Sequence, residues 1–388
     1  GFMGKLIEIK ELVTNFYTYG GVVKALDGVS LSIDKGQTFG LVGESGCGKS
    51  VTARSIMGLI QSPGLIESGE VLLFDDESRA QPSVDILKQS EAYLRDLRGN
   101  KISMIFQEPN AALNPIFTIG EQVSESFLFH QAREMSLKIL DDLSSPHDKT
   151  VSFWKIWLRF CFGLAARDPG SLVLNLAGRI PILKGWKRRL KKEAIQRSID
   201  IIGQLNIPNP EQVVKDYPHN LSGGMKQRIV IAIALACHPL LLIADEATSN
   251  LDVTVQAQIL ELLAELKKEV ISSILLITHD LGVVAETCDR VGVMYAGSLC
   301  EVADVGEIFE RPLHPYTKAL LKSVPKRTQT EKLFSIEGSV PNLITPPSGC
   351  RFHPRCPLRI EICDQQAPDL VQLRNTHLVA CHAVRKEV

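Results

Sequence analysis

The 388-residue chain contains no uncharged apolar run of about 18 residues, so we expect no membrane-spanning helix. It also lacks a basic segment followed by an apolar one near its start, and we expect no secretory signal peptide. Neither sign of charge is in excess, because 43 Lys and Arg face 44 Asp and Glu, for a formal net charge of −1. That balance disfavours a protein that coats nucleic acid.

Cysteine is scarce for a chain of this length, which excludes a disulfide framework as the main source of stability. Four of the nine cysteines nevertheless fall in the last 39 residues, and all three tryptophans lie between positions 154 and 186. The remaining composition, 45% hydrophobic and 22% charged residues, is that of a globular protein. The length favours two or three structural units.

Strand-like and helix-like segments alternate along most of the chain. The first 40 residues have the alternating pattern of strands, and residues from about 119 to 235 are mostly helical in periodicity. Short apolar strands are expected at residues 38–42, 102–106, 240–244, 274–278 and 291–295. This alternation predicts an α/β fold with a parallel sheet and helices on both faces.

A phosphate-binding loop is the strongest motif. Residues 43–50 fit the pattern G-x-x-x-x-G-K-S, between an expected strand and an expected helix. Backbone N–H groups of such a loop surround phosphate oxygens, Lys49 adds a positive charge, and the Ser50 hydroxyl is a Mg²⁺ ligand. A glycine turn that only caps a helix is the alternative interpretation. Cys47 is expected to fill space rather than to react.

A pair of carboxylates complements the loop. The apolar run 240–244 ends in Asp245 and Glu246. At the C-terminal end of a parallel strand, Asp245 would lie beside the Mg²⁺ shell. Glu246 would then be placed to polarise an attacking water. A solvated strand end is the alternative, which the phosphate loop in the same chain disfavours.

Residues 221–228, Leu-Ser-Gly-Gly-Met-Lys-Gln-Arg, decide among phosphate-loop ATPases, because they resemble the signature motif of ATP-binding-cassette (ABC) ATPases. Physically this is a second anion-binding loop, in which a serine and two glycines open a helix. The resemblance implies that the loop binds the γ-phosphate held by an opposite subunit, so that ATP lies between two chains.

Other elements of the family stand in the expected order. Gln107 resembles the Q-loop residue that touches Mg²⁺ and water, Asp252 closes a run that resembles the D-loop, and His279 resembles the switch histidine that contacts the γ-phosphate. Two departures occur, with Ala247 where a proline is usual and Asn250 where alanine is common. Neither removes a charged or metal-binding group, and hydrolysis is expected to survive.

The resemblance also implies an aromatic side chain that stacks on adenine. Tyr19 fits the family spacing and Phe16 is its rival, unless both simply pack on the sheet. The implied ATP-binding set is Tyr19, Phe16, Gly43, Glu44, Ser45, Gly46, Cys47, Gly48, Lys49, Ser50 and Val51. The implied signature set is Leu221, Ser222, Gly223, Gly224 and Met225. The implied magnesium set is Ser50, Gln107 and Asp245, and the catalytic set is Glu246, His279 and Gln107.

The C-terminal part narrows the family to the oligopeptide/dipeptide importer ATPases, which residues 314–321 and 347–350 resemble, as do residues 106–109 and 113–115. The resemblance implies a RecA-like phosphate-loop ATPase core with a parallel sheet, an inserted α-helical subdomain and a small cysteine-rich C-terminal appendix. The expected boundaries are 3–105 with 236–310 for the core, 106–235 for the subdomain, and 311–388 for the appendix.

Four thiols, Cys350, Cys356, Cys363 and Cys381, lie within 32 residues. In an intracellular chain this clustering suggests metal binding over disulfides. The spacing fits zinc sites poorly, whereas a 4Fe–4S cluster is held by four thiolates. The importer resemblance implies the same cluster, with zinc or free thiols as alternatives. Its expected role is to staple a small appendix that has little core.

The segment of about 133–190 is longer than the family pattern and strongly basic, with eleven Lys or Arg against one acidic residue between 149 and 192. Phe153, Trp157, Phe160 and Leu164 form a stripe with helical spacing. Three interpretations remain open: an elaboration of the helical subdomain, a docking surface for a membrane subunit or the opposing ATPase, and a helix that lies on anionic lipid.

Together these features predict a peripheral ATPase at the cytoplasmic face of the membrane that powers solute import, with peptide as the expected solute and oligosaccharide as the alternative. The expected partners are a second, related ABC ATPase subunit, two transmembrane permease subunits and an extracellular substrate-binding protein. Two other classes are a soluble ABC ATPase acting on ribosomes or DNA and a nucleotide-regulated iron–sulfur protein. The former usually carries two cassettes or coiled-coil arms, which this sequence lacks.

Overall fold

The structure is a computed structural model, and it forms two compact units. The first comprises residues 1–98, 240–249 and 263–388, and the second comprises residues 99–239 and 250–262. The structure describes residues 4–75, 83–106, 108–144, 153–168, 185–247, 252–269, 273–323, 336–374 and 376–384.

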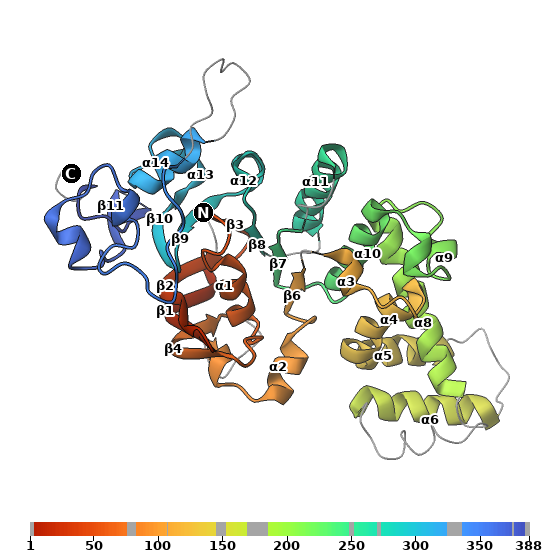
Figure 1. The fold of residues 1–388 in the computed structure, drawn as a ribbon. Helices are drawn as coiled ribbons and strands as arrows, with labels where there is room; N and C mark the ends of the chain where they lie inside the picture. Colours follow the sequence, from red (N-terminus) through yellow and green to blue (C-terminus); the bar gives the residue numbers. More distant parts are fainter. Residues whose placement is uncertain are drawn as a thin grey trace. The chain divides into compact units, whose positions relative to one another are not determined.

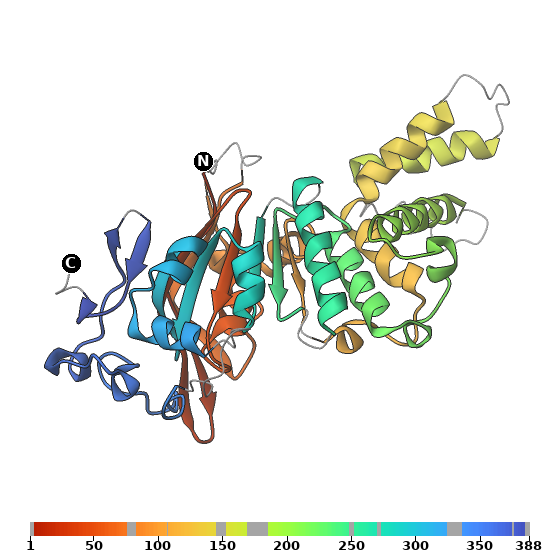
Figure 2. The same cartoon turned by 90° about the horizontal axis from the view of Figure 1, so that it is seen from above.

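The first unit is built on a mixed sheet. Its strands are β3 (Thr38–Val42), β7 (Leu241–Asp245), β8 (Ser273–Ile277), β9 (Arg290–Tyr295), β10 (Ser298–Asp304), β11 (Val371–Arg374) and β12 (His377–Val379). They run in the order β11–β12–β10–β9–β3–β8–β7 (Figures 1 and 2). All residues of β3, β7 and β8 are buried, as expected for strands covered on both faces.

The prediction of a parallel sheet is correct only for the centre of this sheet. Strand β3 pairs in parallel with β8 and β9, and β7 pairs in parallel with β8, whereas β10 is antiparallel to both β9 and β12. The chain reverses between β9 and β10 through Ala296 and Gly297, which both have positive φ. Such a two-residue turn makes a hairpin instead of a crossover, so the sheet continues in antiparallel fashion.

A second, antiparallel sheet confirms the strands expected at the start of the chain. It contains β1 (Lys5–Thr18), β2 (Gly21–Asp34), β4 (Gly64–Leu73) and β5 (Val84–Asp85), in the order β2–β1–β4–β5. The helices of this unit are α1 (Lys49–Ile56), α2 (Glu91–Leu97), α12 (Leu281–Thr287), α13 (Val305–Glu310) and α14 (Pro315–Lys322), with short 3-10 turns at Ile86–Lys88, His353–Arg355 and Glu361–Asp364.

A buried carboxylate attaches the described residues after position 310, which we call the C-terminal segment, to this sheet. Glu301 on β10 is fully buried and accepts hydrogen bonds from the backbone N–H groups of Leu313 (2.6 Å) and His314 (3.0 Å). Its Oε1 lies 2.7 Å from Nε2 of His377 on β12. Burial by itself would raise the pKa of Glu301, but these hydrogen bonds outweigh it and lower the pKa. Glu301 therefore ties β10, the start of α14 and β12 together.

The second unit is mainly helical, as the sequence predicts. It contains β6 (Ile102–Ile105), α3 (Pro109–Ala112), α4 (Ile119–His130), α5 (Ala132–Ser144), α6 (Phe153–Arg167), α8 (Gly185–Gln204), α9 (Pro210–Val213), the 3-10 turn Pro218–Asn220, α10 (Gly223–Leu235) and the beginning of α11 (Val253–Glu269). In the ranges that the structure describes, no helix combines the length and the apolar character that crossing a membrane requires.

The aromatic stripe predicted on α6 lies on a helix, but it is not the face that packs. Phe160 is 54% exposed and Trp157 is half-buried, whereas Leu158 and Phe162 are buried. The ring of Phe162 meets that of Trp186 on α8 edge to face, with centroids 6.5 Å apart. Both sets of residues have helical spacing, so periodicity alone could not tell which face is buried.

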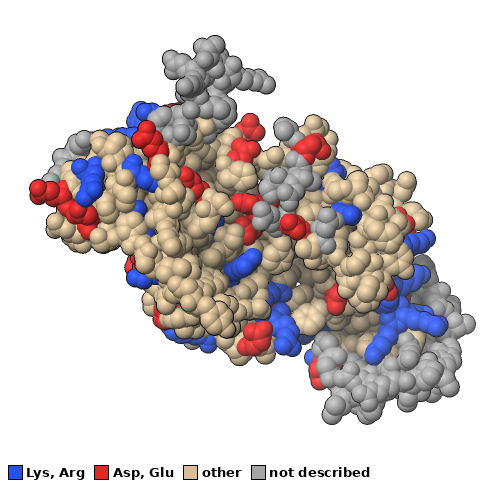
Figure 3. Space-filling view, in the orientation of Figure 1, with Lys and Arg blue, Asp and Glu red and all other residues tan. Residues whose placement is uncertain are grey.

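The basic run of the insert forms the exposed start of α8. Its five basic residues are all exposed: Lys187, Arg188, Arg189, Lys191 and Lys192. Trp186, which precedes the run, and Leu190, which lies within it, are buried. Figure 3 shows Lys and Arg side chains gathered at this end of the second unit.

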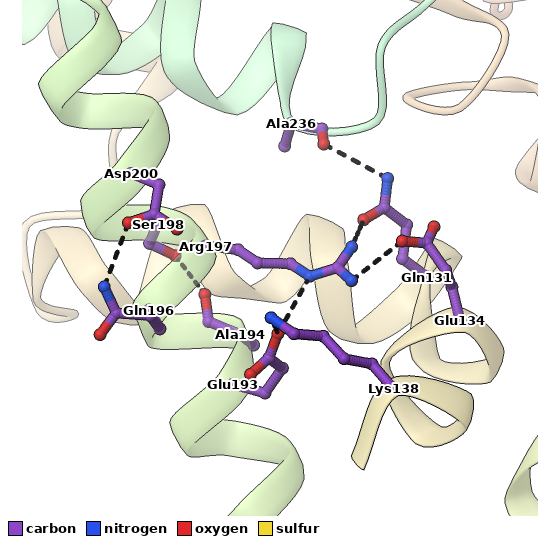
Figure 4. A network of polar contacts seen from close by, with 10 residues as sticks. All are labelled: Gln131, Glu134, Lys138, Glu193, Ala194, Gln196, Arg197, Ser198, Asp200 and Ala236. Atoms are coloured by element: carbon purple, nitrogen blue, oxygen red, sulfur yellow. Dashed lines mark hydrogen bonds and ion pairs between the residues drawn. The ribbon is translucent and has the colours of Figure 1, made fainter. Parts of the chain in front are cut away.

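Helices α5 and α8 are joined by a network around Arg197 (Figure 4). The guanidinium of Arg197 donates to Oε1 of Gln131 (2.6 Å) and of Glu134 (2.9 Å). Glu193, one turn earlier on α8, lies 3.5 Å from Nε of Arg197 and 2.6 Å from Nζ of Lys138 on α5. Arg197 on α8 thus contacts Gln131 at the end of α4, Glu134 on α5 and Glu193 on its own helix.

We expect Arg197→Ala to lower the free energy of unfolding by roughly 1–3 kcal/mol, because the bonds from its guanidinium to Gln131 and Glu134 would be lost. Urea unfolding followed by far-ultraviolet circular dichroism measures this change. Gln196→Ala is the matched control, because Gln196 makes one exposed bond to Asp200 and should cost no more than about 0.5 kcal/mol. Equal losses in the two variants would contradict the role given to the network.

Candidate functional site

The phosphate loop, residues 43–50, connects β3 to α1 in a space that admits only glycine at two positions. At Gly43 (φ 153°) a Cβ atom would lie 2.1 Å from the backbone oxygen of Met294. At Gly48 (φ 106°) it would lie 2.8 Å from the backbone oxygen of Ala25. Gly48 directly precedes α1, so the first N–H groups of that helix open towards the loop. This is the geometry of a phosphate cradle.

Lys49 lies inside the curve of the loop. Its side chain is 5% exposed, and its Nζ donates to the backbone oxygens of Gly43 (2.9 Å) and Glu44 (3.0 Å). The positive charge is therefore held where phosphate oxygens would meet the loop. Cys47 is fully buried, and burial raises the pKa of its thiol, as expected of a residue that fills space.

Ser50 and Asp245 form the pair predicted to hold Mg²⁺. The Ser50 hydroxyl donates to Oδ1 of Asp245 at 2.9 Å, at the end of β7. Burial, and then the charge of Glu246, raise the pKa of Asp245, although the bond from Ser50 acts in the opposite sense. A hydroxyl and a carboxylate are the hard oxygen ligands that Mg²⁺ prefers, so the pair fits the ion. Gln107, the third predicted ligand, lies outside the described residues.

The predicted catalytic residues Glu246 and His279 lie next to each other. Oε1 of Glu246 is 3.6 Å from Nδ1 of His279, whose side chain is 65% exposed. Glu246 has φ 48°, and its N–H donates to the backbone oxygen of Ile277 at the end of β8. This left-handed conformation bends the chain directly after β7, and it places the carboxylate beside the ends of two parallel strands.

The two candidates for the adenine-stacking aromatic differ in their surroundings. Tyr19 is fully exposed at the turn between β1 and β2. Phe16 packs instead on Gly64 of β4, where a Cβ atom would lie only 2.6 Å from its ring. The ring of Tyr19 is thus open to a ligand, whereas that of Phe16 is half-buried.

The signature residues open α10 in the second unit. Ser222 is exposed and caps the helix by accepting a hydrogen bond from the N–H of Met225 at 3.3 Å. Leu221 is buried and anchors the loop, whereas Gly223 and Gly224 lie at the first helical positions. An exposed helix start with two glycines suits an anion, as the sequence predicts.

The predicted D-loop is described only at its last residue. Oδ1 of Asp252 accepts a hydrogen bond from the N–H of Val255 at 3.0 Å and thereby caps α11. Of the two departures from the family pattern, Ala247 is buried and Asn250 lies outside the described residues.

Sequence reasoning missed two residues that hold the phosphate loop. Glu44 binds the guanidinium of Arg355 through both carboxylate oxygens (2.8 and 3.2 Å), and its N–H donates to the hydroxyl of Tyr316 at 3.0 Å. Tyr316 lies within residues 314–321, which resemble the importer family but have no predicted role at the site. For Arg355 no signal existed, because its partner is 311 positions away in the chain.

The four C-terminal cysteines lie in one part of the first unit. The N–H of Cys350 donates to the backbone oxygen of Cys363 at 2.7 Å. Burial raises the pKa of the Cys350 thiol to about 11, and the thiols of Cys363, Cys381 and Cys356 add to this effect. Among the residues that the structure describes, however, no three His, Cys, Asp or Glu side chains are grouped closely enough to hold a metal ion. The predicted cluster, with iron–sulfur or with zinc, is therefore not confirmed.

The chain also matches two models of known protein families. The family model "ABC transporter" matches residues 26–249, and "Oligopeptide/dipeptide transporter, C-terminal region" matches residues 300–363. The chain is 41% identical to the oligopeptide transport ATP-binding protein AppD of Bacillus subtilis, over 99% of this chain and 98% of AppD. It is 40% identical to the dipeptide transport ATP-binding protein DppD of the same organism, over 98% and 95%.

Among solved structures, the dimeric ATP-binding cassette MJ0796 bound to ADP and Pi is similar, with a TM-score of 0.53 and 21% identity. The similarity covers 77% of this chain and 98% of that one. At this identity the likeness concerns the fold, which is that of an ABC ATPase with a mixed sheet and helices.

Asp245→Asn should raise the midpoint of urea unfolding at pH 7 in the absence of Mg²⁺. The folded state raises the pKa of Asp245, so the charged carboxylate is a cost to folding at neutral pH. As the pH falls through this raised pKa, the carboxylate takes up a proton and the advantage of the amide should shrink. Ser50→Ala should have the opposite effect and cost roughly 1–3 kcal/mol, because it removes a donor from a buried carboxylate. A lower midpoint for Asp245→Asn would contradict this assignment.

Proposed function

Since the chain belongs to the ABC transporter family, we propose that it powers the import of peptides by hydrolysing ATP at the phosphate loop. The observation that carries this proposal is that Lys49 and Ser50 open α1 beside the end of β7, where Ser50 bonds Asp245 and Glu246 follows. Such a site combines a phosphate cradle, ligands for Mg²⁺ and a carboxylate for water. The names of AppD and DppD support peptide as the transported solute.

The residues of this site divide the work of hydrolysis. Backbone N–H groups of the loop and the Lys49 ammonium bind the β- and γ-phosphates, while Ser50, Asp245 and Gln107 would hold Mg²⁺. Bound Mg²⁺ supplies charge neutralisation at the phosphates. Glu246 orients and polarises the attacking water, and His279 beside it contacts the γ-phosphate. The open ring of Tyr19 stacks on adenine, for which the packed ring of Phe16 is less suited.

Two such subunits close face to face on ATP. The exposed start of α10, with Ser222 and the glycines after it, binds the γ-phosphate held by the opposite subunit, and Asp252 lies at the same face. The second subunit would be a related ABC ATPase, and closure would act on two membrane permease subunits. An extracellular substrate-binding protein would deliver the solute to these permease subunits. The chain itself would work at the cytoplasmic face of the membrane.

The helical insert at about 133–190 is proposed to contact a membrane subunit or lipid. Its exposed basic start of α8 and the exposed Phe160 of α6 support a surface of this kind. We also propose that the chain divides into an ATPase core at 3–105 and 236–310, a helical subdomain at 106–235 and a C-terminal extension at 311–388.

We further propose that Cys350, Cys356, Cys363 and Cys381 bind a 4Fe–4S cluster, with zinc as the alternative. Four thiols match the ligand set of such a cluster. Support comes from the proximity of two of them, since the backbone N–H of Cys350 donates to the backbone oxygen of Cys363 at 2.7 Å. Because the thiols are not grouped as a metal site, binding would have to draw them together. The cluster would then stabilise the C-terminal segment.

Glu246→Gln should retain ATP binding and lower turnover by roughly 10²–10⁴-fold, the range for loss of a general base. Because the closed pair would no longer hydrolyse ATP, the variant should also accumulate as an ATP-dependent dimer. Single-turnover ATPase assays and size-exclusion chromatography with and without MgATP measure both effects. Full turnover in this variant would remove Glu246 from its role.

Protein purified without oxygen should contain about four iron and four sulfide per chain, as a 4Fe–4S cluster requires. Cys350→Ser and Cys381→Ser should each reduce the iron content. Cys237→Ala is the control, because this buried cysteine belongs to the second unit and should not change it. One zinc per chain without sulfide would favour the zinc alternative, and full iron in the serine variants would exclude these ligands.

A further inference from the structure

The C-terminal segment holds the phosphate loop through a partly buried ion pair. Arg355 is 6% exposed and binds both carboxylate oxygens of Glu44, the second residue of the loop, at 2.8 and 3.2 Å. A bidentate pair between guanidinium and carboxylate fixes direction as well as distance. The side chain of Glu44 therefore has a defined orientation relative to the loop.

The guanidinium of Arg355 is itself held in place by further acceptors. Its Nε donates to the backbone oxygen of Glu337 (2.8 Å), and Nη2 donates to that of Ile336 (3.2 Å). Nη1 also donates to the hydroxyl of Tyr295 at 3.2 Å, at the end of β9. The guanidinium is thus oriented by three acceptors besides Glu44, and a lysine could not reproduce these bonds.

The backbone of Glu44 is fixed by the same region. Its N–H donates to the hydroxyl of Tyr316 on α14, a fully buried residue. The ring of Tyr316 packs on those of Tyr295 (centroids 4.7 Å apart) and Phe352 (5.3 Å). Residues of the C-terminal segment therefore contact both the main chain of Glu44, through Tyr316, and its side chain, through Arg355.

The same segment contacts the β1–β2 turn, which carries Tyr19. The backbone N–H of Lys24 donates to the backbone oxygen of Leu343 at 2.9 Å. A Cβ atom at Gly21 would lie 2.7 Å from a methyl group of Ile344. Residues 343 and 344 thus lie directly against the β1–β2 hairpin.

We propose that Arg355 is a positioning residue of the nucleotide site, which acts through Glu44 to keep the phosphate loop able to bind ATP. This inference rests on the proposed function only in taking ATP as the ligand of the loop. Glu44 carries a negative charge within a loop that has to bind a polyanion. Without its cation, the carboxylate would repel the phosphates, and the loop would lose the contact that sets its orientation.

The test is a double-mutant cycle on the full chain, with MgATP affinity measured by isothermal titration calorimetry. Arg355→Ala should raise the Kd for MgATP roughly tenfold, the factor that corresponds to one lost charge-assisted contact of about 1.4 kcal/mol. In a Glu44→Gln background, the same Arg355→Ala change should have a much smaller effect, because the repelling charge is already absent. Arg355→Lys should fall between the wild type and Arg355→Ala, because it keeps the charge but not the fork.

The matched control is Arg359→Ala, in the same segment, where an exposed arginine pairs with Asp364 and should leave the Kd unchanged. A purely structural role for Arg355 predicts the same loss of affinity in both Glu44 backgrounds, and that result would overturn the proposal. A wild-type Kd in Arg355→Ala would do so as well. If Arg355→Ala does not fold, the cycle is run with Arg355→Lys, and equal losses there count equally against the proposal. If the wild-type chain itself fails to bind MgATP, that result would contradict the proposed function and this inference with it.

Discussion

The nucleotide site depends on how tightly the backbone of the phosphate loop is packed. The loop lies so close to the end of β9 that Gly43 meets the backbone oxygen of Met294, and so close to β2 that Gly48 meets that of Ala25. The N–H of Gly297, in the turn after β9, donates to the backbone oxygen of Cys47 at 2.8 Å. The loop is therefore held by main-chain atoms on several sides. Its N–H groups keep their direction without help from a ligand, so little reorganisation is needed when phosphate binds.

This packing brings charged groups together at a cost to the fold. Lys49 is nearly buried in the loop, and Asp245 and Glu246 follow one another at the end of β7. Burial of Asp245 next to a second carboxylate disfavours its charged form, which is the form that binds a divalent cation. The arrangement is stable because the surrounding apolar strands are fully buried. A site built for ATP and Mg²⁺ thus draws on the stability of the central sheet.

The C-terminal segment belongs physically to the nucleotide unit. Glu301 ties β12 and the start of α14 to β10, and Arg355 and Tyr316 reach the phosphate loop. A segment that sequence reasoning treats as an appendix is therefore part of the frame of the site. Arg355 directly precedes Cys356 in the chain, so one of the four cysteines adjoins the residue that holds Glu44.

The sequence by itself determined the parts of the site that are built from consecutive residues. The loop at 43–50, the strand that ends in Asp245 and Glu246, and the helix that Ser222 opens each carry their chemistry in a few neighbouring positions, because main-chain turns and helix starts are local structures. The tertiary structure alone decided which distant residues support them. The hairpin after β9 made the sheet mixed, packing on α5 and α8 selected the buried face of α6, and the pairing of Arg355 with Glu44 joined positions 311 residues apart. Contacts of this kind arise from the way whole layers pack, and no local spacing encodes them.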